Sequence, residues 1–203
     1  VGRGTVCYLA RKDGEEFIIK DYWAMGGDEE ALNEIHMMEK MSGVRGVPKL
    51  VEYWLVESEP NKVDQTQNYR FKSVRSLKGT FRTHVRVVLK PRARPLHKFR
   101  TKLELLTSIR DIVQIQKEAV EQRKVLHRDC SLNNSMIEDD GNGSQGMLID
   151  WEFAVKIAKN ETYTVGGTGA SSSKPYPAPL IKHSYQDDLE SVFYVFIWIL
   201  IEF

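Results

Sequence analysis

Two aspartates and an asparagine stand at spacings that suit chemistry on a phosphate group. Asp129 closes a His-Arg-Asp tripeptide, Asn134 follows five residues later, and Asp150 ends the apolar run 147–149. In phosphoryl transfer, one aspartate accepts the proton of the attacking hydroxyl, while an asparagine and a second aspartate hold magnesium on the ATP phosphates. Such a reaction needs little covalent help, so a few well-placed residues suffice. The pattern therefore favours a phosphoryl-transfer site.

The tripeptide alone has a plainer interpretation as a polar turn, because short motifs produce false matches. The asparagine and the strand-borne aspartate, in this order, argue against that interpretation. We expect His127 to be a packed structural histidine rather than a base. Cys130, next to Asp129, is expected to be a small buried residue rather than a nucleophile.

Composition is that of an ordinary globular protein. The chain has 203 residues, 41% hydrophobic and 28% charged, with a net charge of +1, which suits one domain or two small lobes. This balance argues against a nucleic-acid surface held by bulk charge. Basic residues gather between positions 90 and 102, and we expect them to form a solvated face.

Two distant cysteines, Cys7 and Cys130, suggest neither a metal site nor a disulfide framework. With no visible secretory signal, we expect an intracellular protein, cytoplasmic or nuclear. The apolar run 191–203 is shorter than the roughly 18 residues typical of a membrane span. A helix apolar on all sides is buried in protein, so we expect further chain beyond this run to cover it.

The chain changes character near residue 90. Its first part is rich in predicted strands and its second part in predicted helices, which indicates an α+β, bilobal arrangement with units 1–90 and 91–203. The polar segment 57–84 is expected to be an extended hairpin or a mobile loop. The expected strands are 6–9, 16–20, 48–56 and 85–89, a hairpin turn is expected at 139–143, and the expected helices are 29–42 and 101–124.

The apolar faces of these helices follow from a 3.6-residue period. Asp28 is the candidate N-cap of the first helix, where Glu34 shares a face with three methionines and needs a partner. The second helix is expected to bury an approximate stripe. Its members are Leu103, Leu106, Ile109, Val113, Gln116 and Val120.

Three motifs together resemble the fungal-specific protein kinase-like family. They are Lys20-Asp21-Tyr22-Trp23, the His-Arg-Asp-Cys-Ser stretch 127–131 and the Asp-Leu-Glu-Ser-Val-Phe-Tyr-Val stretch 188–195. The resemblance spans residues 1–203 and is weakest over the insert 57–84. It implies a bilobal protein kinase-like fold, with a strand-rich first lobe and a helical second lobe that stops after its central helix.

By this resemblance, Lys20 contacts the ATP phosphates and Glu34 pairs with it. Physical chemistry agrees, because a lysine on an apolar strand and a glutamate on an apolar helix face each need a partner. Glu30, one turn earlier, is the rival for this pairing. The alternative is that these are solvated surface charges.

The resemblance assigns the other site residues by position. Asp129 corresponds to the catalytic base, and Asn134 and Asp150 to the magnesium ligands, whose hard oxygen donors suit that ion. Arg128 corresponds to the arginine that receives a phosphate or acidic group, with a purely structural role as the alternative. Asp188 corresponds to the aspartate that braces the catalytic loop.

The nucleotide would be held by glycines and by a hinge. Gly2 and Gly4 resemble the turn that cradles phosphates, and Leu89, Lys90 and Pro91 resemble the segment where adenine docks. The third glycine of the kinase pattern is absent, which weakens the cradle.

Other departures concern catalysis. Trp151 and Glu152 follow Asp150 where phenylalanine and glycine are usual, which stiffens the segment and adds a negative charge. Ser131 stands where serine/threonine kinases carry a lysine, and Leu180 replaces the glutamate of an Ala-Pro-Glu motif.

These features predict an ATP- and Mg²⁺-dependent kinase acting on a protein substrate, through a serine or threonine hydroxyl by family analogy. A pseudokinase scaffold and a small-molecule kinase are the alternatives, because a fold alone does not establish activity. No membrane or nucleic-acid partner is expected, and the oligomeric state is left open. Residues 160–187, rich in Gly, Ser and Pro, are either a control element or an unregulated flexible loop.

Overall fold

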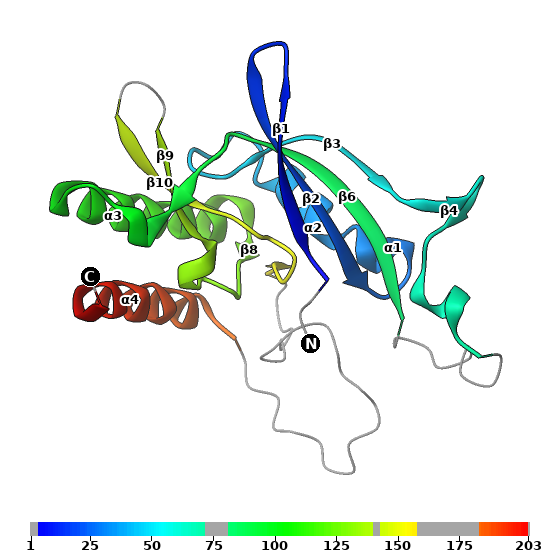
Figure 1. The fold of residues 1–203 in the computed structure, drawn as a ribbon. Helices are drawn as coiled ribbons and strands as arrows, with labels where there is room; N and C mark the ends of the chain where they lie inside the picture. The colour runs from blue at the N-terminus through cyan, green and yellow to red at the C-terminus, as the bar shows by residue number, and fades with distance from the viewer. Residues whose placement is uncertain (1–3, 72–80, 140–142, 158–182, 203) are drawn as a thin grey trace.

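The computed structural model of the chain describes residues 4–71, 81–139, 143–157 and 183–202 (Figure 1). A four-stranded antiparallel sheet and two short helices form the first part, and two long helices with a three-stranded sheet and a strand pair form the second. The predicted α+β class is therefore confirmed. The division into lobes at residue 90 stays a prediction.

The main sheet has the strand order β1-β2-β6-β3. Asp13 and Gly14, both with positive φ, make the tight turn between the first two strands. The register places Cys7 opposite Lys20, and Lys20 opposite Val87. The strands are β1 (Val6–Lys12), β2 (Glu15–Met25), β3 (Lys49–Leu55) and β6 (Arg82–Lys90).

One face of this sheet is covered by α1 (Asp28–Ala31) and α2 (Asn33–Lys40). Alternation along β2 turns Lys20, Tyr22 and Ala24 inward, and the last two form an apolar cluster with residues of both helices. The single helix predicted over 29–42 is wrong, because Leu32 (φ −85°, ψ 5°) interrupts it.

The predicted N-cap of this helical segment is also wrong. Gly27 occupies the cap position, and the Glu30 side chain accepts a hydrogen bond from the Gly27 N–H at 2.9 Å. Asp28 instead accepts a hydrogen bond from the Gln65 amide at 2.9 Å. Glu30 is therefore engaged at the start of α1, away from the sheet lysine.

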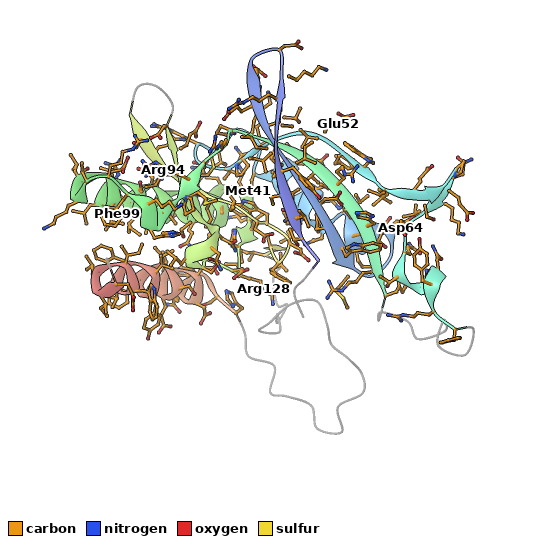
Figure 2. The ribbon with its side chains drawn as sticks, viewed as in Figure 1. Met41, Glu52, Asp64, Arg94, Phe99 and Arg128 are labelled. Carbon is orange, nitrogen blue, oxygen red and sulfur yellow. The ribbon has the colours of Figure 1, made fainter. Side chains whose placement is uncertain are left out.

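The segment after β3 is a small hairpin, β4 (Glu57–Glu59) and β5 (Lys62–Val63), followed by the 3₁₀ turn η1 (Thr66–Tyr69). His84 of β6 ties it to the sheet, since its ring nitrogens contact Asp64 at 3.1 Å and Asp21 (Figure 2). Of the two alternatives for 57–84, an extended hairpin or a mobile loop, the described part contains a short hairpin over 57–63, and residues 82–84 belong to β6. Residues 72–80 lie outside the described part.

A second sheet, β10-β9-β7, lies against the long helix α3 (Lys102–Glu118). Its strands are β7 (Arg94–Pro95), β9 (Ser135–Asp139) and β10 (Ser144–Leu148), and the short turn η3 (Leu96–Lys98) precedes the helix. Thr101 caps α3 by accepting the Glu104 N–H at 3.1 Å. The π-helical turn η4 (Ala119–Arg123) and left-handed Lys124 (φ 57°) end the helical segment.

The predicted buried stripe of α3 is largely wrong. Leu103, Leu106 and Val113 are exposed, whereas the residues that face the core begin at Glu104 and Leu105. Gly146 of β10 explains the choice of face, since an added Cβ there would lie 2.1 Å from the backbone oxygen of Ser108. The small Ser108 must therefore face the sheet. The buried set is Glu104, Leu105, Ser108, Ile112, Ile115 and Gln116, of which Gln116 belonged to the predicted stripe.

The last helix, α4 (Tyr185–Glu202), packs on α3. Val192, Val195 and Ile199 are buried, while Phe193, Trp198 and Ile201 are exposed. In the described residues the helix is therefore buried on one face only, and the expectation that further chain covers its other apolar side chains stays a prediction. None of the helices in the described ranges is both long and apolar enough to cross a membrane.

Candidate active site

The loop after β8 (Val125–Leu126) is held by a buried carboxylate of α4. Asp188 accepts hydrogen bonds from the backbone N–H of His127 at 3.0 Å and of Arg128 at 2.9 Å. Arg128 has a positive φ of 69°, a conformation that side-chain-bearing residues rarely adopt without support. Asp188 therefore braces the loop backbone in the way the sequence predicts (Figure 2 labels Arg128).

The His127 ring is buried, and both of its nitrogens take part in hydrogen bonds. Its Nε2 lies 3.0 Å from the Ile149 carbonyl, and its Nδ1 accepts the Asp129 N–H at 3.2 Å. These contacts define a neutral ring with the proton on Nε2. Burial lowers the pKa of His127, which agrees with that state and with the predicted structural role.

Asn134, in the turn η5 (Leu132–Asn134), links the loop to the next strand. Its amide nitrogen donates to the Asp129 carboxylate at 3.0 Å and to the Asp129 carbonyl at 2.8 Å. The backbone carbonyl of Asn134 accepts a hydrogen bond from the Ile149 N–H at 3.0 Å. The side chains of Asp129 and Asn134 are therefore fixed relative to the strand that leads to Asp150.

Lys20 connects the main sheet to the rest of the site. Its ammonium donates to both Glu34 oxygens at 2.8 Å and to Asp150 Oδ1 at 2.9 Å. Burial by itself would lower the pKa of Lys20, but the two carboxylates outweigh burial and raise it. Glu34 is thus the partner, and the rival Glu30 is not.

Asp150 is ready to act as an anion. Burial by itself would raise its pKa, but the charge and hydrogen bond of Lys20 outweigh that effect and hold the pKa below its usual range. Asp150 has a positive φ of 63° and lies in the bend of the chain that follows β10, which ends at Leu148. Trp151, the next residue, is fully buried and meets the His127 ring edge-on at 4.5 Å.

Trp151 also explains how this bend tolerates an unusual sequence. The indole N–H donates to the Leu148 carbonyl at 3.2 Å, so the large ring fills the core without an unpaired polar atom. The departure from phenylalanine at this position is therefore accommodated. The short strand β11 (Val155–Lys156) follows and pairs with β8.

Asn33 is a residue that sequence reasoning missed. It is the first residue of α2, and its amide donates to the carbonyls of Glu152 and Ala154 at 2.9 and 3.0 Å. The helix that carries Glu34 is therefore tied to the segment that follows Asp150. The only sequence signal was the amide side chain next to the predicted glutamate.

A cavity of about 870 Å³ opens between the start of β1 and the loop, a size within the usual range for small-molecule sites. Gly4, Asp129, Asn134 and Asp150 lie on its wall, together with Ser131. The structure thus gathers four of the predicted site residues. Gly2 lies outside the described residues.

The predicted hinge is not brought to this cavity. Lys90 lines a different hollow, together with Pro91, and its ammonium contacts Glu15 at 3.1 Å. Leu89 packs among the partly buried residues between the sheet and α2. Their proposed contact with adenine stays a prediction.

The donor atoms suit a hard cation. Asn134 and Asp150 offer amide and carboxylate oxygens, the ligands that magnesium takes beside phosphates and water. Within the described ranges, no group of three or more His, Cys, Asp or Glu side chains is assembled for a metal. The residues present therefore fit an ion that a nucleotide would help to hold, rather than an all-protein metal cage.

The basic residues near the hinge are mostly paired. Arg94 contacts Glu104, and Arg100 contacts Asp139 at 2.8 Å. Arg92 lies 3.5 Å from Glu16. Arg92 and Arg100 are exposed and agree with the predicted solvated face, whereas Arg94 lies largely buried against Glu104 and departs from it.

Comparison with known proteins places the chain in a family. No curated protein matches it at a significant level. The family model described as "Fungal protein kinase" matches residues 1–200, a span that contains the loop, the lysine pair and both aspartates. Because this match covers nearly the whole sequence, the chain belongs to the fungal protein kinase family.

Proposed function

We propose that the chain carries the ATP- and Mg²⁺-dependent site of a protein kinase that acts on serine or threonine hydroxyls. Membership of a kinase family gives the coarser class, a kinase-type transferase. The observation that carries the finer proposal is the position of Lys20, whose ammonium contacts Glu34 and Asp150. Asp150 in turn shares one cavity with Asp129 and Asn134.

The roles follow from the chemistry of each group. Asp129 would accept the proton of the acceptor hydroxyl, held in place by the Asn134 amide. Lys20 would orient the phosphates while Glu34 keeps its ammonium in position. Magnesium, when bound by Asn134 and Asp150, would neutralise charge on the phosphates.

The proposed organisation has two lobes, 1–90 and 91–203, with the cavity where they meet. Gly4, with φ 68°, brings the backbone to the cavity wall. Gly2, Leu89 and Lys90 are proposed to complete the nucleotide site by analogy with the family. A protein substrate would approach the Asp129 side.

One observation favours a second candidate, a pseudokinase. Ser131 lies on the cavity wall where protein kinases of the serine/threonine type carry a lysine, so the wall lacks a positive charge there. Glu152 adds a negative charge after Asp150. A small-molecule kinase, which does without that lysine, is a third hypothesis that fits the same feature.

Transfer of the γ-phosphate tests the proposal. The chain, with γ-labelled ATP and Mg²⁺, is incubated with peptide libraries carrying Ser, Thr or Tyr and, separately, with small alcohols and sugars. Label on Ser or Thr peptides supports the proposal. Label on small molecules alone would replace the proposal with a small-molecule kinase. Bound ATP without any transfer would favour the pseudokinase.

A further inference from the structure

Tyr22 lies beside Lys20 and has no part in the roles described above. It stands two residues later on β2, so both side chains turn to the same face of the sheet. Its side chain is 1% exposed and packs in the cluster formed with Ile35 and Val85. The Lys20 ammonium lies 4.5 Å from the centre of the Tyr22 ring, well within the range of a cation–π contact.

The ring provides a contact that the carboxylates do not. A lysine ammonium has three N–H donors, and here Glu34 and Asp150 receive them. If Lys20 turned a donor to a phosphate and Asp150 turned to a metal ion, these hydrogen bonds would be redistributed. Attraction to the ring face uses no donor, so it remains through that exchange.

The Tyr22 hydroxyl is the less important end of this side chain. It is buried beside the Glu34 carboxylate and makes no hydrogen bond of regular geometry within the described part of the chain. Burial, together with the charge of Glu34, raises the pKa of Tyr22, so the hydroxyl stays neutral. A buried hydroxyl without a well-formed hydrogen bond adds little stability, and the ring is the part of the side chain that faces the Lys20 ammonium.

We propose that Tyr22 is a positioning residue, whose ring face holds the Lys20 ammonium in place for the nucleotide phosphates. The role for nucleotide rests on the proposed function, whereas the effect on the ammonium does not. Two substitutions separate the contribution of the ring from that of the hydroxyl, since Tyr22→Phe keeps the ring and Tyr22→Leu removes it. Val85→Ala is the matched control, because Val85 faces Tyr22 in the register and is equally buried.

The first measurement follows the ammonium itself by ¹H–¹⁵N NMR of the Lys20 Nζ group, without nucleotide. The parent chain, Tyr22→Phe and Val85→Ala should show a slowly exchanging ammonium signal at low temperature. Tyr22→Leu should lose that signal through faster exchange. Val85→Ala should also lower the melting temperature but keep the signal, which separates loss of the ring from general destabilisation. A signal unchanged in Tyr22→Leu would overturn the proposal.

The second measurement is the affinity for Mg²⁺–ATP by calorimetry. Without the ring the ammonium of the free protein leaves its position, and nucleotide binding has to restore it. The strength of a cation–π contact sets the upper bound of this cost, about 3- to 30-fold in affinity, so Tyr22→Leu should weaken binding by up to that factor. Tyr22→Phe and Val85→Ala should match the parent, and Tyr22→Leu should add nothing on a Lys20→Met background. A weakened Tyr22→Phe, or a further loss in the double variant, would refute the ring as the acting group.

The two measurements separate the possible failures. A parent chain that binds no nucleotide, yet shows the predicted ammonium signals, would remove the proposed function and leave Tyr22 as the residue that positions Lys20. A parent chain that binds nucleotide, with Tyr22→Leu equal to it in both measurements, would remove only the inference about Tyr22.

Discussion

At the scale of single residues, the site is organised by one buried cation between two carboxylates. The side chains of Lys20 and Glu34 are 7% and 2% exposed, so their pairing is largely shielded from water. A buried pair loses much of its stabilising effect when one partner is removed, because the other charge is left uncompensated. The pair therefore acts less as a source of stability than as a fixed point near Asp150.

Asp129→Asn should remove catalysis and spare nucleotide binding. The substituted amide keeps the shape and still accepts the Asn134 hydrogen bond, but it cannot take a proton from the acceptor hydroxyl. A positioned base contributes roughly 10²–10⁴-fold, so the rate of phosphate transfer should fall by about that factor. Transfer rate and ATP affinity are measured on the same preparation.

The control for this change is Asp13→Asn, in the exposed turn between β1 and β2. Asparagine tolerates the positive φ of that turn, so transfer should continue at the parent rate. Full activity of the Asp129→Asn variant would show that another group acts as the base.

At the scale of elements, α2 and the segment after Asp150 move as one unit if the contacts of Asn33 hold. Two hydrogen bonds join its amide to the carbonyls of Glu152 and Ala154. The neighbouring residue, Glu34, reaches Asp150 through Lys20. Two independent connections therefore fix the helix on the Asp150 side of the site.

Asn33→Asp should break one of these connections at constant size. A carboxylate cannot donate to the two carbonyls and would be repelled by them. Leaving such groups unsatisfied costs about 1–3 kcal/mol, which chemical denaturation would measure as a lower free energy of unfolding. The same exchange at Asn61, in the exposed turn between β4 and β5, should leave stability within about 0.5 kcal/mol. Equal stability of both variants would mean that Asn33 does not tie α2 down.

Gly146→Ala tests the packing of α3 on β10. The added Cβ would lie 2.1 Å from the Ser108 backbone oxygen, so helix or strand must shift. Overpacking of this kind costs about 1–3 kcal/mol or more. Gly14→Ala has open space but a positive φ of 81°, so it should lose only the conformational part, about 1–2 kcal/mol. A Gly146→Ala variant as stable as the parent would contradict this close contact.

At the scale of the whole molecule, the sheet and the helical part are joined near the site as well as through the chain. The Leu148 N–H donates to the Gly46 carbonyl at 2.9 Å, and Arg45 contacts Gln145. Gly46 needs its positive φ of 83° and has no room for a side chain. Together with the lysine contact to Asp150, these bonds join the first part of the chain to the second.

The sequence predicted what depends on order and local chemistry. The expected strands 6–9 and 16–20 lie within β1 and β2. The spacing of His-Arg-Asp, Asn134 and Asp150 predicted residues that the fold brings to one cavity. An apolar helix face with one glutamate predicted that Glu34 needs a partner. Lys20 is that partner in the structure.

What failed depends on contacts between distant segments. The buried face of α3 is decided by the approach of Gly146 to Ser108, which a helical period alone does not show. The roles of Asn33 and Tyr22 also depend on neighbours that only the fold supplies. Residues 160–182 of the segment expected to be either a control element or an unregulated flexible loop lie outside the described residues.

The most direct test of the central claim is magnesium-dependent binding of ATP, followed as a shift in the melting temperature with and without Mg²⁺. A ligand at about 100 times its dissociation constant stabilises the folded state by about 2.7 kcal/mol. We predict a shift in the parent chain that requires Mg²⁺, and no magnesium-dependent part in Asp150→Ala. A parent chain that shows no shift with ATP and Mg²⁺, or an equal magnesium-dependent shift in Asp150→Ala, would contradict the site described here.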